Sequence, residues 1–131
     1  MSQPYRQTNT TVSLINYHFI WIPRRRRKVL VDDVKRRVTQ LIYEKAVELE
    51  CNVVHLAVEP EHIHLFLNCP PDLAPKQIMH RIKGYSSYIL RKEFPHLKKM
   101  PSMWTTSYFV STAGNVSSST LEKYIAAQGK N

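Results

Sequence analysis

Negative charge is in short supply in this sequence of 131 residues. Asp and Glu number 10 against 19 Lys and Arg, so the formal net charge is +9. Such an excess of positive charge points to a polyanionic partner, of which nucleic acid is the leading candidate. No window approaches the ~20 consecutive apolar residues of a membrane-spanning helix, so membrane attachment is not expected.

Cysteine and signal-like segments are also scarce. Cys51 and Cys69 are isolated and form no Cys-x-x-Cys pair, so we expect both to be reduced core thiols. Residues 1–11 are polar and lack the apolar stretch of a secretory signal, which leads us to expect a flexible N-terminal segment and a cytoplasmic protein. The sequence has no ATP-binding loop and no internal repeat, and its apolar fraction of 43% suffices for one domain over residues 1–131.

Residue periodicity predicts an α+β domain. Apolar residues at helical spacing favour a helix from about Val31 to Glu50, with Asp32 or Asp33 as its cap. The other expected elements are a strand at 10–22, a hairpin of strands at 52–59 and 62–69 joined by Pro60-Glu61, a helix that starts near Pro75 and ends before Pro95, a strand at 104–112, and a final helix at about 116–130. This order fits a ferredoxin-like (RRM-like) fold, in which the helices pack on one face of an antiparallel sheet and the C-terminal helix is an addition.

Two histidines share one face of the second hairpin strand. Because side chains alternate along a strand, His62 and His64 point to the side opposite Ile63, which belongs with the helices. Two imidazoles so placed can close around one metal ion, although such pairs also occur as ordinary surface histidines. His55 and Glu59 share that face if the hairpin register allows, and either could support a metal, whereas Glu61 is more simply a turn residue.

The last predicted helix carries a second pair of polar side chains. Tyr124 and Gln128 are four residues apart, so they lie on one helical face and can reach a common point. A hydroxyl nucleophile could thus sit beside an amide oxygen that binds metal. Taken alone, a tyrosine at position 124 is more often a half-buried packing residue than a nucleophile.

The combination of these motifs, in this order, resembles a known family. The segments that carry the resemblance are Tyr17-His18-Phe19-Ile20-Trp21, His62-Ile63-His64, Trp104-Thr105-Thr106-Ser107-Tyr108 and Tyr124-Ile125-Ala126-Ala127-Gln128. From about residue 13 to its C-terminus, the chain resembles the HUH single-tyrosine transposases of small insertion sequences. This resemblance implies a single-stranded DNA transposase that cleaves and rejoins the ends of an insertion sequence.

The resemblance also assigns roles to individual residues. It implies that His62, His64 and Gln128 bind Mg²⁺ or Mn²⁺, and that Tyr124 is the catalytic nucleophile that forms a 5′-phosphotyrosine and leaves a free 3′ hydroxyl. A tyrosine hydroxyl has an ordinary pKa of about 10 and needs such surroundings to attack a phosphate. Further implied are single-stranded DNA substrates with subterminal hairpins, and a homodimer in which the Tyr124 helix can complete the partner's site.

A basic block is the best candidate for the DNA contact. The block comprises Arg24, Arg25, Arg26, Arg27 and Lys28, directly after the first strand, and Lys83 could extend the surface along the second long helix. Guanidinium groups suit phosphate oxygens, although a solvated loop without a partner would have the same sequence.

One alternative from another functional class remains open at this point. A ferredoxin-like sheet with aromatic side chains and a basic flank could be a non-catalytic module that binds single-stranded nucleic acid without metal. A related tyrosine enzyme acting on repeated extragenic elements, or a replication-type nickase, is a further option. The short chain and Gln128 favour the insertion-sequence transposase.

Overall fold

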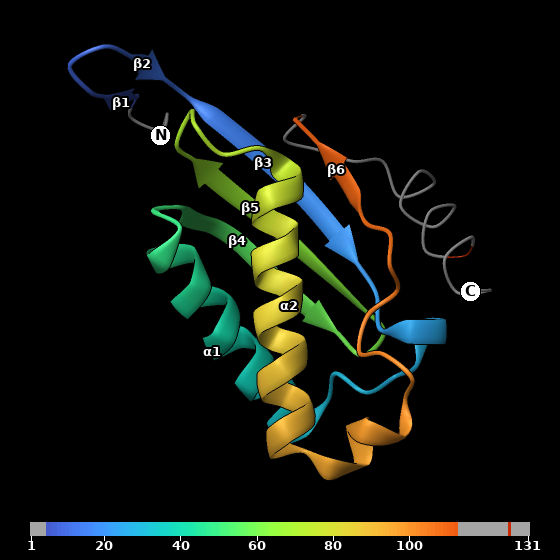
Figure 1. Ribbon diagram of the computed structural model, residues 1–131. Helices are drawn as coiled ribbons and strands as arrows, with labels where there is room; N and C mark the ends of the chain where they lie inside the picture. The colour runs from blue at the N-terminus through green and yellow to red at the C-terminus, as the bar shows by residue number, and fades with distance from the viewer. Residues whose placement is uncertain (1–4, 113–125, 127–131) are drawn as a thin grey trace.

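The computed structural model describes residues 5–112 and residue 126, and its centre is a four-stranded antiparallel sheet (Figure 1). The strands lie in the order β4-β5-β3-β6, with bounds Asn52–Glu59, His62–Cys69, Ile15–Trp21 and Phe109–Ser111. Helices α1 (Asp32–Glu48) and α2 (Pro75–Glu93) lie side by side on one face of this sheet. Two single-turn helices, η1 (Arg24–Arg26) and η2 (Pro95–Lys99), occupy the connections.

This arrangement confirms the expected ferredoxin-like fold. The four sheet strands and two helices follow one another as strand, helix, strand, strand, helix, strand, and all three strand pairings of the sheet are antiparallel. The hairpin β4-β5 has the predicted bounds on both strands. Its register pairs Glu59 with His62, and a bulge between Val53 and His55 shifts the ladder by one residue.

The core lies between the sheet and the helices. Alternation along β5 sends Ile63, Leu65 and Leu67 toward the helices, and all three are fully buried. From β3, Phe19 and Trp21 point the same way and are also inaccessible to solvent. The sheet is therefore dry on this inner face, and the alternate residues of β3 and β5 lie on its outer face.

Part of the N-terminal segment, for which the sequence predicts flexibility over residues 1–11, forms a small hairpin. Strand β1 (Arg6–Gln7) pairs with β2 (Val12–Ser13), and the Arg6 side chain donates hydrogen bonds to the side chain and the backbone carbonyl of Asn68, at 2.9 and 3.1 Å. This anchor ties the hairpin to the end of β5. The strand expected at 10–22 is consequently two strands, β2 and β3, separated at Leu14.

Two further element boundaries differ from the sequence-based expectation. The helix α1 has Val31 as its N-cap, and neither Asp32 nor Asp33 caps it, because Asp32 itself adopts a positive φ of 51° at the start of the helix. The strand expected at 104–112 begins only at Phe109, because the Lys83 ammonium binds the carbonyl oxygens of residues 105–107. The expected C-terminal helix at 116–130 lies outside the described residues, apart from Ala126.

One buried polar contact ties α2 to the segment before β6. The indole N–H of Trp104 donates to Oγ of Ser86 at 3.1 Å, and that hydroxyl in turn donates to the Ile82 carbonyl at 2.7 Å. Both residues are buried, and the Trp104 ring stands edge-on to Trp21 with ring centroids 6.0 Å apart. Ser86 lies on the buried face of α2, and it supplies the acceptor that this indole requires.

Replacing Ser86 by alanine should destabilise the protein by about 1–3 kcal/mol, because the buried indole N–H of Trp104 loses its acceptor. Urea unfolding followed by tryptophan fluorescence measures this change. Ser87→Ala is the matched control, since Ser87 is the next residue on the same helix and is only partly buried. Equal stability of the two variants would contradict the role given to Ser86.

Candidate metal and nucleic-acid site

The outer face of the sheet brings the predicted histidines together. His62 and His64 lie on this face of β5, and their ring centroids are 5.0 Å apart. The register places Ala57 of β4 and Ile20 of β3 on either side of His64. Neither neighbour carries a metal-binding group, so the two imidazoles are the candidate ligands of this part of β5.

The imidazole of His62 is held by a carboxylate. Its Nδ1 lies 2.7 Å from Oε1 of Glu61, and both side chains are largely buried. Burial alone would raise the pKa of the Glu61 carboxyl, but its hydrogen bond with His62 and the nearby Arg26 bring that pKa below its usual value. Glu61 therefore does more than the turn role expected of it, because it fixes the ring of His62 and leaves Nε2 as the nitrogen with a free lone pair.

The imidazole of His64 is held by another histidine. Its Nδ1 lies 3.3 Å from Nε2 of His18, and the two rings are stacked with centroids 5.5 Å apart. His18 was not among the predicted site residues, because strand parity indicates only its face and the register of β3 with β5 brings it beside His64. His18 is two residues before Ile20, which pairs with His64, so both histidines lie on the outer face of neighbouring strands.

Burial and neighbouring charge favour the neutral form of two histidines in this cluster. Burial, together with the neighbouring His62, His18 and His55, lowers the pKa of His64 to about 4. Burial also lowers the pKa of His18, with His55 contributing. Neutral imidazole is the form that ligates a metal ion, so His64 does not need to lose a proton to bind one at neutral pH.

The hairpin register settles where His55 and Glu59 lie. Both are on the outer face, as the sequence allowed, with Glu59 opposite His62 and His55 opposite Phe66. Within residues 5–112 and 126, however, no group of three or more His, Cys, Asp or Glu side chains is arranged to hold a metal ion.

The donor set at His62 and His64 suits a divalent cation. Each imidazole has its Nδ1 engaged by a neighbour, Glu61 in one case and His18 in the other, so both can offer Nε2. Such outer partners are the usual support of metal-binding histidines. Tyr124 and Gln128, the expected nucleophile and third ligand, lie outside the described residues.

The basic block forms a turn beside this site. Arg26 lies 3.8 Å from the carboxylate of Glu61, and Arg24 is partly buried with its guanidinium 3.3 Å from Oγ of Ser102. Arg25, Arg27 and Lys28 are exposed, and among the described residues none of them forms an ion pair. The structure thus holds Arg24 against Ser102 and leaves the other four side chains of the block exposed, with Arg26 also within ion-pair distance of Glu61.

Lys83 lies on the other side of the sheet, where its ammonium is already occupied. Nζ donates to the carbonyl oxygens of Thr105, Thr106 and Ser107, at 2.7, 3.2 and 3.3 Å, and burial lowers the pKa of Lys83 to about 8. An ammonium has three donors, so these contacts use them all. A DNA contact through Lys83 stays a prediction, and it would require release of one of these bonds.

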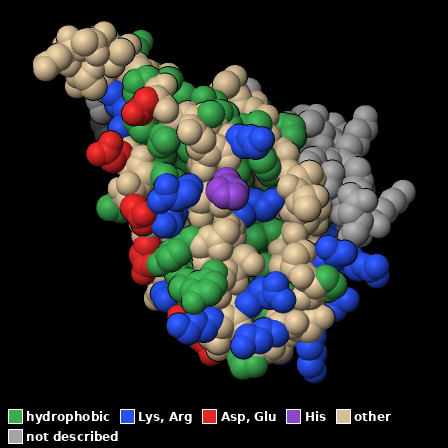
Figure 2. Space-filling view, in the orientation of Figure 1, with side chains coloured by type: hydrophobic (Ala, Val, Ile, Leu, Met, Phe, Trp, Pro, Cys, Tyr) green, Lys and Arg blue, Asp and Glu red, His purple; other side chains and the backbone are tan. Residues whose placement is uncertain are grey.

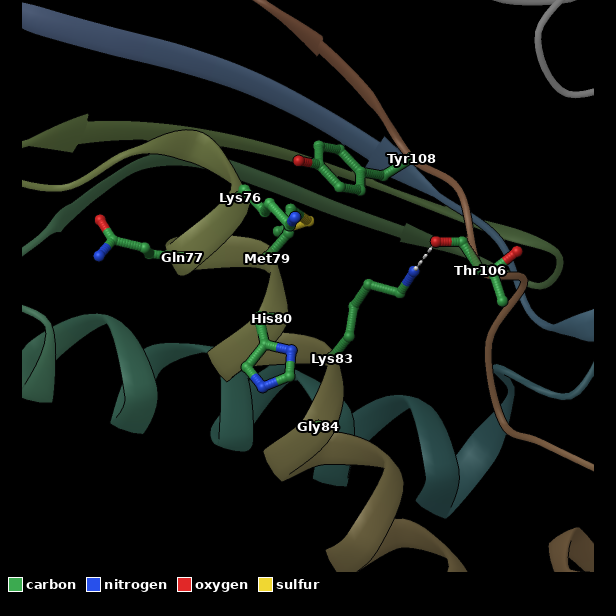
Figure 3. Close-up of a pocket in the computed structure, with 8 residues that line it drawn as sticks. All are labelled: Lys76, Gln77, Met79, His80, Lys83, Gly84, Thr106 and Tyr108. Atoms are coloured by element: carbon green, nitrogen blue, oxygen red, sulfur yellow. Dashed lines mark hydrogen bonds between the residues drawn. The ribbon is translucent and has the colours of Figure 1, made fainter.

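A pocket of about 450 Å³ opens next to Lys83, between α2 and the segment that leads into β6 (Figure 3). Its lining residues are Lys76, Gln77, Met79, His80, Lys83, Gly84, Thr106 and Tyr108. Tyr108 packs against Phe19, which belongs to the inner face, so this pocket is not the histidine site. Figure 2 shows that Lys and Arg side chains are spread over the helical face, so positive charge is not confined to the turn.

Fold and site together define a ferredoxin-like domain with a supported histidine pair beside a cationic turn. Residues 11–128 match the family model described as IS200-like transposase. The match spans most of the chain, and the protein therefore belongs to the IS200-like transposase family. This membership agrees with the resemblance carried by the His-Ile-His and Tyr-x-x-x-Gln motifs. In the described part of the chain, no helix is long and apolar enough to cross a membrane.

Individual relatives support the same family. The chain is similar to the ISDra2 transposase TnpA of Deinococcus radiodurans, with 28% identity over 117 residues that cover 87% of this chain and 84% of that protein. It is also similar to the transposase for insertion sequence element IS200 of Salmonella typhimurium, with 32% identity over 117 residues that cover 86% of this chain and 75% of that one.

Solved structures give the same picture of the fold. A crystal structure described as that of a transposase from Deinococcus radiodurans R1 superimposes with a TM-score of 0.87 and 29% identity, over 94% of this chain and 97% of that one. The structure of a REP-associated tyrosine transposase bound to a REP hairpin has a TM-score of 0.57 and 18% identity, over 98% of this chain and 70% of that one. The second likeness concerns the fold alone.

Acidification of the metal-free protein should lower its stability through His64. The pKa of this group is about 4 in the folded protein against 6.5 ordinarily, so the unfolded chain binds more protons between these values. The free energy of unfolding should be highest above pH 6.5 and should fall toward pH 4, by up to about 3 kcal/mol. Urea unfolding at a series of pH values should show a weaker dependence for His64→Gln than for His96→Gln, and equal curves would contradict this account.

Proposed function

We propose that this transposase cuts and rejoins single-stranded DNA in a metal-dependent reaction, with His62 and His64 as two ligands of a divalent cation. The observation that carries the proposal is the supported histidine pair on the outer face of β5, each ring held at Nδ1. Gln128 would be the third ligand and Tyr124 the nucleophile, as the family resemblance implies. Mg²⁺ or Mn²⁺ is the expected cation, since two imidazoles and an amide oxygen leave positions for phosphate oxygens and water.

The surroundings of the two imidazoles prepare them for this role. Glu61 accepts a hydrogen bond from the Nδ1–H of His62, which orients the ring and raises the basicity of its Nε2. Burial keeps His64 neutral, so its lone pair is available at neutral pH. When bound, the cation would polarise a non-bridging oxygen of the scissile phosphate and so reduce the charge that an attacking phenol oxygen meets.

The chemical step proposed for Tyr124 is a transesterification. Its phenol oxygen loses a proton and attacks the phosphorus, the bond to the 3′ oxygen breaks, and the departing strand gains the proton as a 3′ hydroxyl. The product is a 5′-phosphotyrosine, in which the new phosphodiester retains the energy of the broken bond. A second 3′ hydroxyl can attack it and rejoin strands, so the reaction proceeds without ATP.

Single-stranded DNA with subterminal hairpins is the proposed substrate, and the cationic turn is its proposed entry to the site. Arg25, Arg27 and Lys28 face solvent at a turn that touches the site through Arg26 and Glu61. Exposed guanidinium groups there would position the phosphate backbone beside the histidines. We also propose a homodimer, in which the Tyr124 helix of one subunit can serve the metal site of the other.

Incubation of the protein with Mn²⁺ and labelled single strands that carry the ends of its insertion sequence should give a covalent protein–DNA adduct. Tyr124→Phe should abolish the adduct because the attacking oxygen is gone, whereas Tyr88→Phe should keep it, since Tyr88 is an exposed residue of α2. Denaturing gel electrophoresis measures the adduct. Persistence of the adduct in Tyr124→Phe would rule out this nucleophile, and DNA binding without any adduct in the wild type would support the non-catalytic alternative.

Removal of two exposed arginines should weaken DNA binding and reduce its dependence on salt. For Arg25→Ala/Arg27→Ala, the slope of log affinity against log salt should fall by about two, one for each lost phosphate contact. Fluorescence anisotropy with a labelled single strand gives this slope. The control is Lys35→Ala/Arg36→Ala, which removes the same charge from the exposed face of α1. An equal effect of both double variants would show that the turn has no specific role.

A further inference from the structure

His18 stands out among the groups that the proposed reaction does not use. Its ring lies against His64 and stands edge-on to Phe66, with centroids 6.1 Å apart, so the two aromatic neighbours fix its plane. In the described part of the chain, its buried Nδ1 has no hydrogen-bond partner. Among the described residues, the ring of His18 therefore forms one hydrogen bond, between its Nε2 and Nδ1 of His64.

This contact decides which nitrogen of His64 can bind a cation. With Nδ1 of His64 directed at His18, its Nε2 is the nitrogen left for a metal. A metal on Nε2 leaves the remaining proton of the neutral ring on Nδ1, where it points at Nε2 of His18. His18 must then accept a hydrogen bond from this N–H, in the same way that Glu61 accepts a hydrogen bond from His62.

We infer that His18 is a positioning residue of the metal site, which accepts the Nδ1 hydrogen bond of His64 and thereby presents Nε2 of His64 to the cation. The inference rests on the metal site proposed above, and it assigns this chain's histidine pair two different supports, a carboxylate for His62 and an imidazole for His64. A direct role of His18 as a third imidazole ligand is disfavoured by geometry. Within residues 5–112 and 126, no three His, Cys, Asp or Glu side chains converge on one metal position.

The first test measures Mn²⁺ affinity by isothermal titration calorimetry, without DNA and without turnover. His18→Phe keeps an aromatic ring but removes the acceptor, and it should weaken Mn²⁺ binding about 10–100-fold, the usual loss for a support of a metal ligand. His18→Gln retains an acceptor oxygen and should recover most of that affinity. His55→Phe is the matched control, because His55 is an exposed histidine on the same face, and its variant should bind Mn²⁺ as the wild type does.

The second test detects the hydrogen bond itself. In ¹⁵N-histidine-labelled protein loaded with Zn²⁺ as a diamagnetic probe, NMR should show a proton on Nδ1 of His64 and a scalar coupling across the bond to Nε2 of His18. The signal should vanish in His18→Phe and persist in His55→Phe, while circular dichroism verifies that each variant is folded. Unlike affinity alone, this signature reports the hydrogen bond between the two rings directly.

Three results would overturn the inference: unchanged Mn²⁺ affinity in His18→Phe, equal losses in His18→Phe and His18→Gln, or a metal-loaded His64 whose proton lies on Nε2. Failure of the metal site proposed above looks different, because His62→Ala and His64→Ala would then leave Mn²⁺ affinity unchanged. In that case the coupling between His18 and His64 in the metal-free protein still tests whether the two rings share a hydrogen bond.

Discussion

The alternation of side chains along β5 is the constraint on which the site depends. Ile63, Leu65 and Leu67 are fully buried against the helices, and this fixes His62 and His64 on the other side. A slip of one residue would expose the aliphatic side chains and bury the imidazoles, which the hydrophobic effect forbids. The energy that holds the core together therefore also sets the orientation of the two candidate ligands, and no separate interaction is needed to keep them on the outer face.

The two residues that hold the histidine rings come from different parts of the chain, one next to its histidine in the sequence and the other far from it. Glu61 precedes His62 directly and belongs to the hairpin turn, whereas His18 lies 46 positions from His64 and arrives through the pairing of β3 with β5. The same turn region brings Arg26 to Glu61, which connects the cationic turn with the site. The two candidate ligands, the groups that orient their rings and the cationic turn thus all lie around one end of β5.

Periodicity was enough to predict the two long helices, the β4-β5 hairpin, the fold class and the face of the histidines, because local burial decides all of these. It could not predict the role of His18 or Glu61, since strand register and side-chain direction settle those contacts. The late start of β6 could not be predicted from the sequence either, because the carbonyls of residues 105–107 bind Lys83 of α2, a contact between distant parts of the chain. This contact shows that a lysine in a basic sequence can be used by the fold itself. Arg24 is a second example, because its guanidinium donates a hydrogen bond to Ser102.

The central claim is that one divalent cation binds His62 and His64 together through their Nε2 atoms. Pulsed electron paramagnetic resonance of Mn²⁺ bound to ¹⁵N-histidine-labelled protein tests it most directly, because the spectrum reports imidazole nitrogens that are coordinated to the ion. We expect couplings from two such nitrogens, with one lost in His62→Ala and the other in His64→Ala. A spectrum that neither substitution alters, or that contains no histidine nitrogen, would contradict the claim.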